Sequence, residues 1–187
     1  MGLTDKITQF LAGWAMGSGK TFGPPVVMGK ESIMKPKAHG TSETPVQTDL
    51  RWECDNALAD RICNYNRHYA ENSQYFLSTS FLRETADVKA SGGEITFYDS
   101  NSGKELFVAP RGRTYDEFIT ESRKHGWPSF RDVEVNWDNV RILPGGETVS
   151  VDGTHLGHNL PDGKGNRYCI NLVCVAGRPK GDFKGDE

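Results

Sequence analysis

Alternating apolar and polar positions in the second half of the chain predict a set of short strands. Residues 94–98 and 105–109 are rich in β-branched and aromatic side chains. The segment 99–103 between them has the Asp, Ser, Asn and Gly composition of a turn. Further extended segments are expected within residues 133–142 and 147–151, so the pattern predicts a mainly β domain.

The last apolar run, residues 167–175, predicts a strand that follows a chain reversal at residues 161–166. Alternate residues on a strand share a face, so Arg167, Cys169 and Asn171 are expected to point the same way. A guanidinium, a thiol and an amide on one face indicate a chemical site better than they indicate a core.

Helical spacing of apolar residues predicts helices in three places, at residues 1–17, 55–72 and 115–124. Asp55 is expected to cap the second helix. The apolar face expected for it consists of Ala57, Leu58, Ile62, Tyr65 and Tyr69. Residues 75–84 form a further short segment, and the proline-containing stretch 22–46 is expected to run as an extended arm.

Cys169 can act as a nucleophile once it ionises, and a free thiol has a pKa of about 8.5. A guanidinium on the same face favours the thiolate. Asn171 can donate a hydrogen bond to a reacting oxygen. His155 and His158, across the predicted hairpin, can transfer protons near neutral pH. This combination favours a reactive thiol over a buried structural cysteine.

Three motifs occur in a fixed order: GWPSF at residues 126–130, HLGHNLPDG at residues 155–163 and RYCIN at residues 167–171. They resemble the signature blocks of the methionine-R-sulfoxide reductases of the B type. The likeness runs from about residue 96 to 176, with weaker similarity back to about Pro45. It implies that family's α+β, mainly β fold of two antiparallel sheets, here with N-terminal helices.

The resemblance also implies roles for individual residues. Cys169 would be the nucleophile, Trp127 would hold the methyl group of the sulfoxide, and Phe130 would belong to the same substrate-binding motif. The residues expected to shape the site are His155, His158, Asp162, Arg167 and Asn171. The implied activity is thiol-dependent reduction of methionine-R-sulfoxide, free or in proteins, through a sulfenic acid on Cys169.

The chain departs from the family at the metal site. Many members bind zinc through two Cys-x-x-Cys pairs. The matching positions here are Asp99, Ser102, Val149 and Asp152. Tetrahedral zinc sites are usually built from thiolate or imidazole ligands, and these four residues offer neither. No metal is therefore predicted.

The second departure concerns the recycling cysteine, whose usual position is His125 in this chain. The second thiol could be Cys63, Cys54 or Cys174, or an external thiol could act directly. Cys174 lies five residues along the same predicted strand as Cys169, so it should face the other way. Cys63 is favoured because its helix could lie across the sheet. A thioredoxin-like dithiol is the expected reductant, with no other cofactor.

The 187 residues carry 22 Lys and Arg against 25 Asp and Glu, a net charge of −3. This balance predicts neither nucleic-acid binding nor attraction to an anionic membrane. The absence of a run of 18 apolar residues predicts no membrane span. The four cysteines do not indicate a disulfide scaffold. Residues 1–17 lack the features of a transit or signal peptide, and Lys6 does not fit a myristoylation motif, but a targeting or membrane-surface role of this segment stays open. A cytoplasmic location is expected, with an organelle as the alternative.

Residues 17–21 end like a phosphate-binding loop, but Trp14 stands where that motif needs glycine, so nucleotide binding is not expected. We divide the chain into an N-terminal helix and arm (1–45), a reductase-like domain (46–177) and a flexible tail (178–187). Two other functions stay open: a non-catalytic binding protein on the same fold, or a cysteine-based redox sensor. The redox-sensor hypothesis assigns no function to Trp127 or His155.

Overall fold

A five-stranded antiparallel sheet with strand order β3-β7-β6-β5-β4 holds the second half of the chain together. Its strands are β3 (Ser129–Phe130), β4 (Val140–Ile142), β5 (Glu147–Ser150), β6 (His155–Asn159) and β7 (Tyr168–Ile170). A second antiparallel pair is formed by β1 (Ile95–Tyr98) and β2 (Glu105–Ala109). The predicted fold of two antiparallel sheets is confirmed.

The computed structural model describes residues 22–181. The helix predicted over residues 1–17 and the loop at 17–21 therefore lie outside the described residues. In the described part, no helix is long and apolar enough to cross a membrane.

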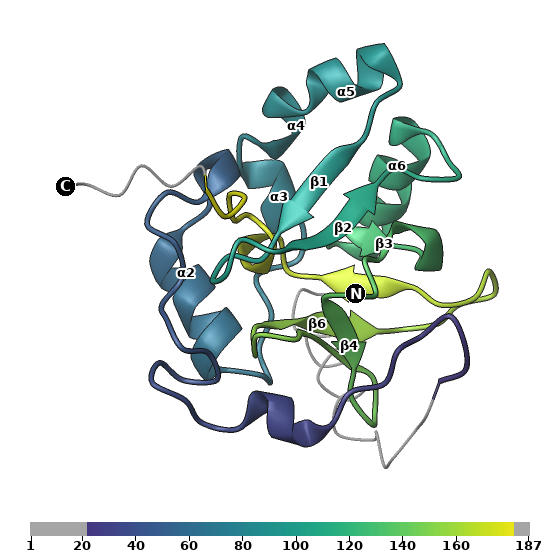
Figure 1. The fold of residues 1–187 in the computed structure, drawn as a ribbon. Helices are drawn as coiled ribbons and strands as arrows, with labels where there is room; N and C mark the ends of the chain where they lie inside the picture. Colours follow the sequence, from purple (N-terminus) through teal and green to yellow (C-terminus); the bar gives the residue numbers. More distant parts are fainter. Residues whose placement is uncertain (1–21, 182–187) are drawn as a thin grey trace.

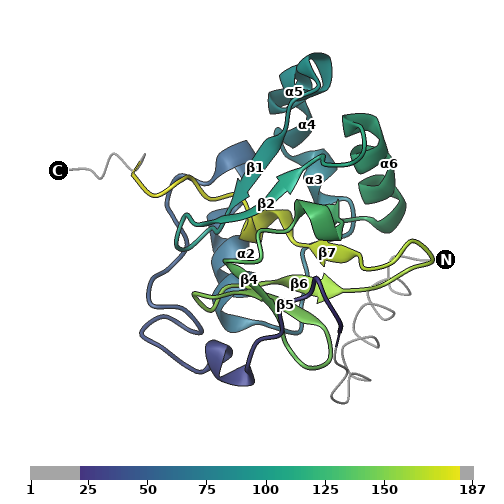
Figure 2. The ribbon, with the colours of Figure 1, turned by 45° about the vertical axis from the view of Figure 1, so that its right-hand side comes forward.

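Short helices surround the sheets (Figures 1 and 2). They are η1 (Glu31–Met34), η2 (Arg51–Glu53), α2 (Asn56–Asp60), η3 (Arg61–Tyr65), α3 (Tyr75–Ser78), α4 (Phe81–Glu84), α5 (Ala86–Ser91), α6 (Tyr115–His125), η4 (Asp132–Glu134) and η5 (Leu172–Cys174). The prediction of α6 is confirmed. Thr114 caps it reciprocally: its hydroxyl accepts from the Glu117 N–H at 3.2 Å, and its own N–H donates to the Glu117 carboxylate at 2.6 Å.

The helix predicted over residues 55–72 is shorter than expected. Asp55 does cap it, but α2 passes into the π-helical turn η3, which ends at Tyr65. Tyr65 and Tyr69 are 60% and 58% exposed, so their assignment to an apolar face is wrong. The segment that follows the helix leads to Glu71, which is buried and bonded to η5. A helix continued to residue 72 would not place Glu71 there.

Strand β7 is also shorter than predicted, and the 3-10 turn η5 follows it. The Glu71 carboxylate accepts hydrogen bonds from the backbone N–H groups of Leu172 and Val173, at 2.8 and 3.1 Å. These two backbone N–H groups are therefore bonded to a side chain, and not to a neighbouring strand. Cys174 is therefore not on a common strand with Cys169, and the predicted alternation of their faces does not apply.

The arm at residues 22–46 covers the open edge of β4. Gly29 N–H donates to the Ile142 carbonyl at 2.8 Å, and Ile142 N–H donates to the Val27 carbonyl at 3.0 Å. Such pairing protects an exposed strand edge. Of the extended segment predicted at residues 133–142, only β4 forms a strand, since η4 precedes it and Val133 is exposed.

The beginning of the predicted flexible tail is anchored. Arg178 N–H donates to the Gln47 side-chain oxygen at 2.7 Å, and its guanidinium pairs with the Asp49 carboxylate at 2.7 Å. Residue 178 is therefore part of the folded domain, and residues 182–187 lie outside the described residues.

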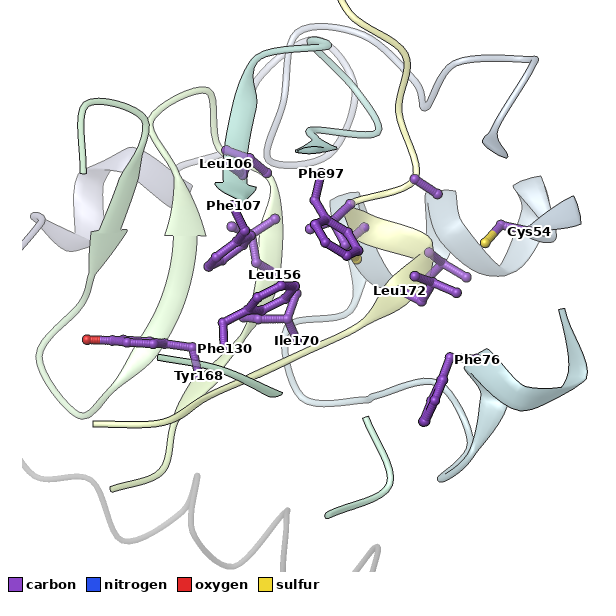
Figure 3. Packing of buried hydrophobic residues seen from close by; sticks show 14 of the residues in the cluster. Cys54, Phe76, Phe97, Leu106, Phe107, Phe130, Leu156, Tyr168, Ile170 and Leu172 are labelled. Carbon is purple, nitrogen blue, oxygen red and sulfur yellow. The ribbon is translucent and has the colours of Figure 1, made fainter. Parts of the chain in front are cut away.

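An aromatic core joins the two sheets (Figure 3). Phe107 of β2 and Phe130 of β3 are stacked, with ring centroids 4.3 Å apart, and Phe97 of β1 meets Phe130 edge-on at 5.0 Å. Because Phe130 is fully enclosed by this cluster, the structure gives it a packing role. The expected contact of Phe130 with substrate stays a prediction.

Candidate functional site

One rung of the five-stranded sheet brings several predicted residues together. The register pairs Ser129 with Cys169, Cys169 with His158, and His158 with Glu147, across β3, β7, β6 and β5. Directly paired residues of antiparallel strands project to the same face, with their Cβ atoms about 4.5–5.5 Å apart. The thiol therefore has an imidazole beside it on the neighbouring strand.

A β-bulge places the second histidine on this face. His155 and His158 are three residues apart and would face opposite sides of a regular strand. The register shift in β5 and β6 pairs His155 with Val149 and leaves Leu156 as the extra residue. His155 Nδ1 lies 2.8 Å from the Glu147 carboxylate, which confirms that both histidines lie on the side of Glu147.

Glu147 and Arg67 are site residues that the sequence patterns missed. The Arg67 guanidinium donates to the Glu147 carboxylate from Nε at 3.0 Å, and His155 contacts the same carboxylate. Burial works to raise the pKa of Glu147, but the bonds to His155 and Arg67 outweigh it and hold the pKa below its ordinary value. An ionised Glu147 fixes the orientation of the His155 ring.

The indole of Trp127 packs against the thiol of Cys169. These two residues form a small apolar cluster with Ala70 and Leu160, apart from the main core. Trp127 Nε1–H donates to the Glu71 carbonyl at 3.0 Å. Cys169 is only 3% exposed, so a molecule that reaches its sulfur must displace part of this cover.

Burial raises the pKa of Cys169 to about 11. Arg167 lowers it by its charge and a hydrogen bond, and Glu71 raises it again. The activation expected from Arg167 is thus present, but burial outweighs it in this closed arrangement. Within residues 22–181, Nε and Nη1 of Arg167 are buried and have no hydrogen-bond partner. Buried donors without a protein partner are uncommon in native structures.

Asn171 is occupied by backbone contacts. Its Nδ2 donates to the Leu156 carbonyl at 3.0 Å, and its Oδ1 accepts from the Glu71 N–H at 2.9 Å. The amide therefore ties the bulge in β6 to the segment that covers Cys169. The predicted hydrogen bond from Asn171 to a reacting oxygen stays a prediction.

Asp162 lies in the β6–β7 hairpin and receives two hydrogen bonds from Arg131, at 2.9 and 2.8 Å. The bonds from Arg131 hold its pKa well below the ordinary range. Asp162 and His125 both line an open groove of about 690 Å³ between α6 and this hairpin. Burial, followed by the charge of Arg167, lowers the pKa of His125.

Glu71 connects these parts. Its backbone contacts Trp127 and Asn171, and its carboxylate caps η5. Burial raises the pKa of this carboxyl to about 8, although the Leu172 and Val173 N–H groups work in the opposite direction. The local sequence pattern does not identify Glu71, because the spacing of apolar residues around it predicts an amphipathic helix.

Replacement of Glu71 by glutamine is expected to flatten the pH dependence of stability. The folded-state pKa of about 8 lies above the ordinary value of 4.5, so the folded state holds this proton more tightly. The stability that this proton gives is complete below pH 4.5 and is lost as the pH rises toward about 8. Urea unfolding across that range would measure the free energy of unfolding.

The matched control for this test is Glu43→Gln, at an exposed position. Its stability should fall with rising pH as in the wild type. A slope that persists unchanged in Glu71→Gln would show that another group takes up the proton.

The positions matched to zinc ligands are Asp99, Ser102, Val149 and Asp152. Asp99 is buried and accepts from the Thr154 hydroxyl at 2.8 Å, while Asp152 pairs with Lys104 at 2.9 Å. Val149 has no donor atom in its side chain. This set does not fit a tetrahedral zinc site. In the described part of the chain, no group of three or more His, Cys, Asp or Glu side chains is arranged to hold a metal ion.

The other predicted cysteines lie elsewhere. Cys63 belongs to the main core, where its Sγ is 2.7 Å from Sγ of Cys174. Cys54 is buried immediately before α2. The structure therefore brings Cys63 together with Cys174, whereas Cys169 packs with Trp127.

Comparisons with known proteins give relatives of one kind. No family model matches the chain, and no solved structure matches it. Curated proteins named peptide methionine sulfoxide reductase MsrB do match. That of Methanosarcina mazei is 31% identical over 104 residues, which cover 50% of this chain and 74% of the relative. That of Methanosarcina barkeri is 30% identical over 105 residues, covering 50% and 72%.

A relative from Pseudomonas putida with the same name is 37% identical over 65 residues, which cover 29% of this chain. The chain spans 50% of the length of that relative.

Proposed function

Because the chain belongs to the MsrB family of peptide methionine sulfoxide reductases, we propose that it reduces methionine-R-sulfoxide, free or within proteins, with a thiol as the reductant. The observation that carries this proposal is the site around Cys169. Cys169 is the cross-strand neighbour of His158 in β6 and β7, and Trp127 packs against it. A nucleophile, a proton donor and an apolar surface for a methyl group thus meet at one place.

In the proposed reaction, the Cys169 thiolate attacks the sulfur of the sulfoxide. His158 donates a proton to the oxygen, and the two unpartnered donors of Arg167 can hold that oxygen. The oxygen passes to Cys169, so the methionine sulfur is reduced by two electrons and Cys169 is oxidised to a sulfenic acid. The face of Trp127 receives the methyl group.

The sulfenic acid then condenses with a thiol, which forms a disulfide and releases water. A second thiol attacks that disulfide and regenerates Cys169. The contact between Cys63 and Cys174 favours an external thiol in this step over Cys63. A thioredoxin-like dithiol supplies both electrons in the proposed cycle.

A non-catalytic binding protein is the second candidate, and one observation favours it. With a pKa of about 11, Cys169 is a neutral thiol at physiological pH in the closed arrangement. Such a protein would bind methionine sulfoxide against Trp127 without turnover.

Turnover of the separate R and S epimers of a peptide methionine sulfoxide distinguishes these functions. With dithiothreitol, the wild type should reduce the R epimer alone, and Cys169→Ser should fall to the rate of the buffer. Cys54→Ser is the matched control, because Cys54 lies outside the group around Cys169, and it should retain activity. Binding of either epimer by folded, reduced wild type without any reduction would support the second candidate instead.

A further inference from the structure

Two cysteines outside the candidate site lie in direct contact. The Sγ atoms of Cys63 and Cys174 are 2.7 Å apart, although the two residues are 111 positions apart in the sequence. This separation lies between the disulfide bond length of about 2.05 Å and the usual contact distance of unbonded sulfur atoms. Both side chains are fully buried.

Both residues belong to the main apolar core, and Sγ of Cys63 also lies 3.9 Å from the Val173 carbonyl. Cys63 lies in the π-helical turn η3, which packs directly on η5, where Cys174 is the last residue. The backbone of both elements therefore already holds the side chains at bonding range.

We propose that Cys63 and Cys174 form a disulfide bond as the chain folds. One of the two thiolates attacks an external low-molecular-weight disulfide and releases one thiol, leaving a mixed disulfide on the protein. The other cysteine attacks that mixed disulfide and releases the second thiol. The pair loses two electrons and two protons, and the external disulfide is reduced to two thiols.

The exchange must precede complete burial. Burial raises the pKa of both thiols, and the neighbouring Cys63 raises that of Cys174 further. In the folded protein neither is a competent nucleophile, and neither is open to a reductant. The bond, once formed, is therefore expected to resist reducing agents that act on the native protein.

The bond would join two parts of the framework around Cys169. Segment η3 leads to Ala70, which packs against the Cys169–Trp127 cluster, and η5 directly follows β7. Closing so long a loop restricts the unfolded chain strongly. The inference does not depend on the proposed reductase activity, since it concerns a pair apart from Cys169 and needs no substrate.

The test is to unfold and reduce the full chain, refold it in a mixture of reduced and oxidised glutathione, and alkylate it in denaturant. Mass spectrometry should find alkyl groups on Cys54 and Cys169 only, and a peptide that links Cys63 to Cys174. The melting temperature should lie above that of protein refolded in dithiothreitol by roughly 5–15 °C.

Cys54→Ser should keep both the cross-link and the difference in melting temperature, whereas Cys174→Ala should lose both. The thiol count of the wild type decides the matter even where Cys174→Ala does not fold. Alkylation of all four cysteines in the oxidised, folded wild type would overturn the proposal. A cross-link from Cys63 to Cys169 would also overturn it.

Discussion

Replacing His158 with alanine is expected to lower kcat for reduction of methionine-R-sulfoxide by about 10²–10⁴-fold, the usual range for loss of a general acid. His158 is the direct cross-strand partner of Cys169. Its ring is also closely confined, since a Cβ atom on Gly146 would lie 2.8 Å from His158 Nε2. The register places His158 beside Cys169 on the neighbouring strand, and Gly146 limits the space around its ring.

Steady-state kinetics across the neutral pH range would check this prediction. The pH profile of kcat should differ between the variant and the wild type, because the variant lacks the proposed proton donor. His39→Ala is the control, since His39 pairs with Asp60 at 2.8 Å and is not one of the paired residues of β6 and β7. A kcat for His158→Ala close to that of the wild type would exclude His158 as the acid.

Replacing Asp99 with alanine is expected to destabilise the fold by about 2–4 kcal/mol, which corresponds to a melting temperature lower by roughly 5–15 °C. The buried Asp99 carboxylate accepts from the Thr154 hydroxyl at 2.8 Å and from the Asn101 N–H at 2.8 Å. Its removal leaves those buried donors unpaired. It also removes the side-chain bond between the β1–β2 turn and the β5–β6 turn.

Urea unfolding would give the free energies of unfolding. The control Asp138→Ala, at an exposed position, should change stability by no more than about 0.5 kcal/mol. Because these bonds hold the turns together, treatment of the wild type with EDTA should leave its melting temperature unchanged. A marked drop with EDTA, restored by zinc, would contradict this explanation of how the turns are joined.

The parts of the fold that depend on neighbouring residues were predictable from the sequence. The turn between β1 and β2 follows from its Asp, Ser, Asn and Gly residues, and α6 follows from apolar residues at helical spacing. The resemblance of the three motifs pointed to Cys169, His158 and Trp127. The register then brings Cys169 and His158 together, and packing adds Trp127.

The rest depends on contacts between distant segments, which local patterns do not report. An apolar run that includes Cys169 and Cys174 reads as one strand, but the carboxylate of Glu71 ends it after three residues. The bulge at Leu156 is a property of the pairing of β5 with β6, and it determines the side to which His155 points. The contact between Cys63 and Cys174 likewise spans most of the domain.

A single turnover tests the central claim most directly. Fully reduced protein would be mixed with excess peptide methionine-R-sulfoxide, with no other thiol present, and a reagent selective for sulfenic acids would then be added. The proposed mechanism predicts about one equivalent of methionine for each chain and a trapped sulfenic acid on Cys169. Folded protein that forms no methionine and leaves Cys169 unmodified would contradict it.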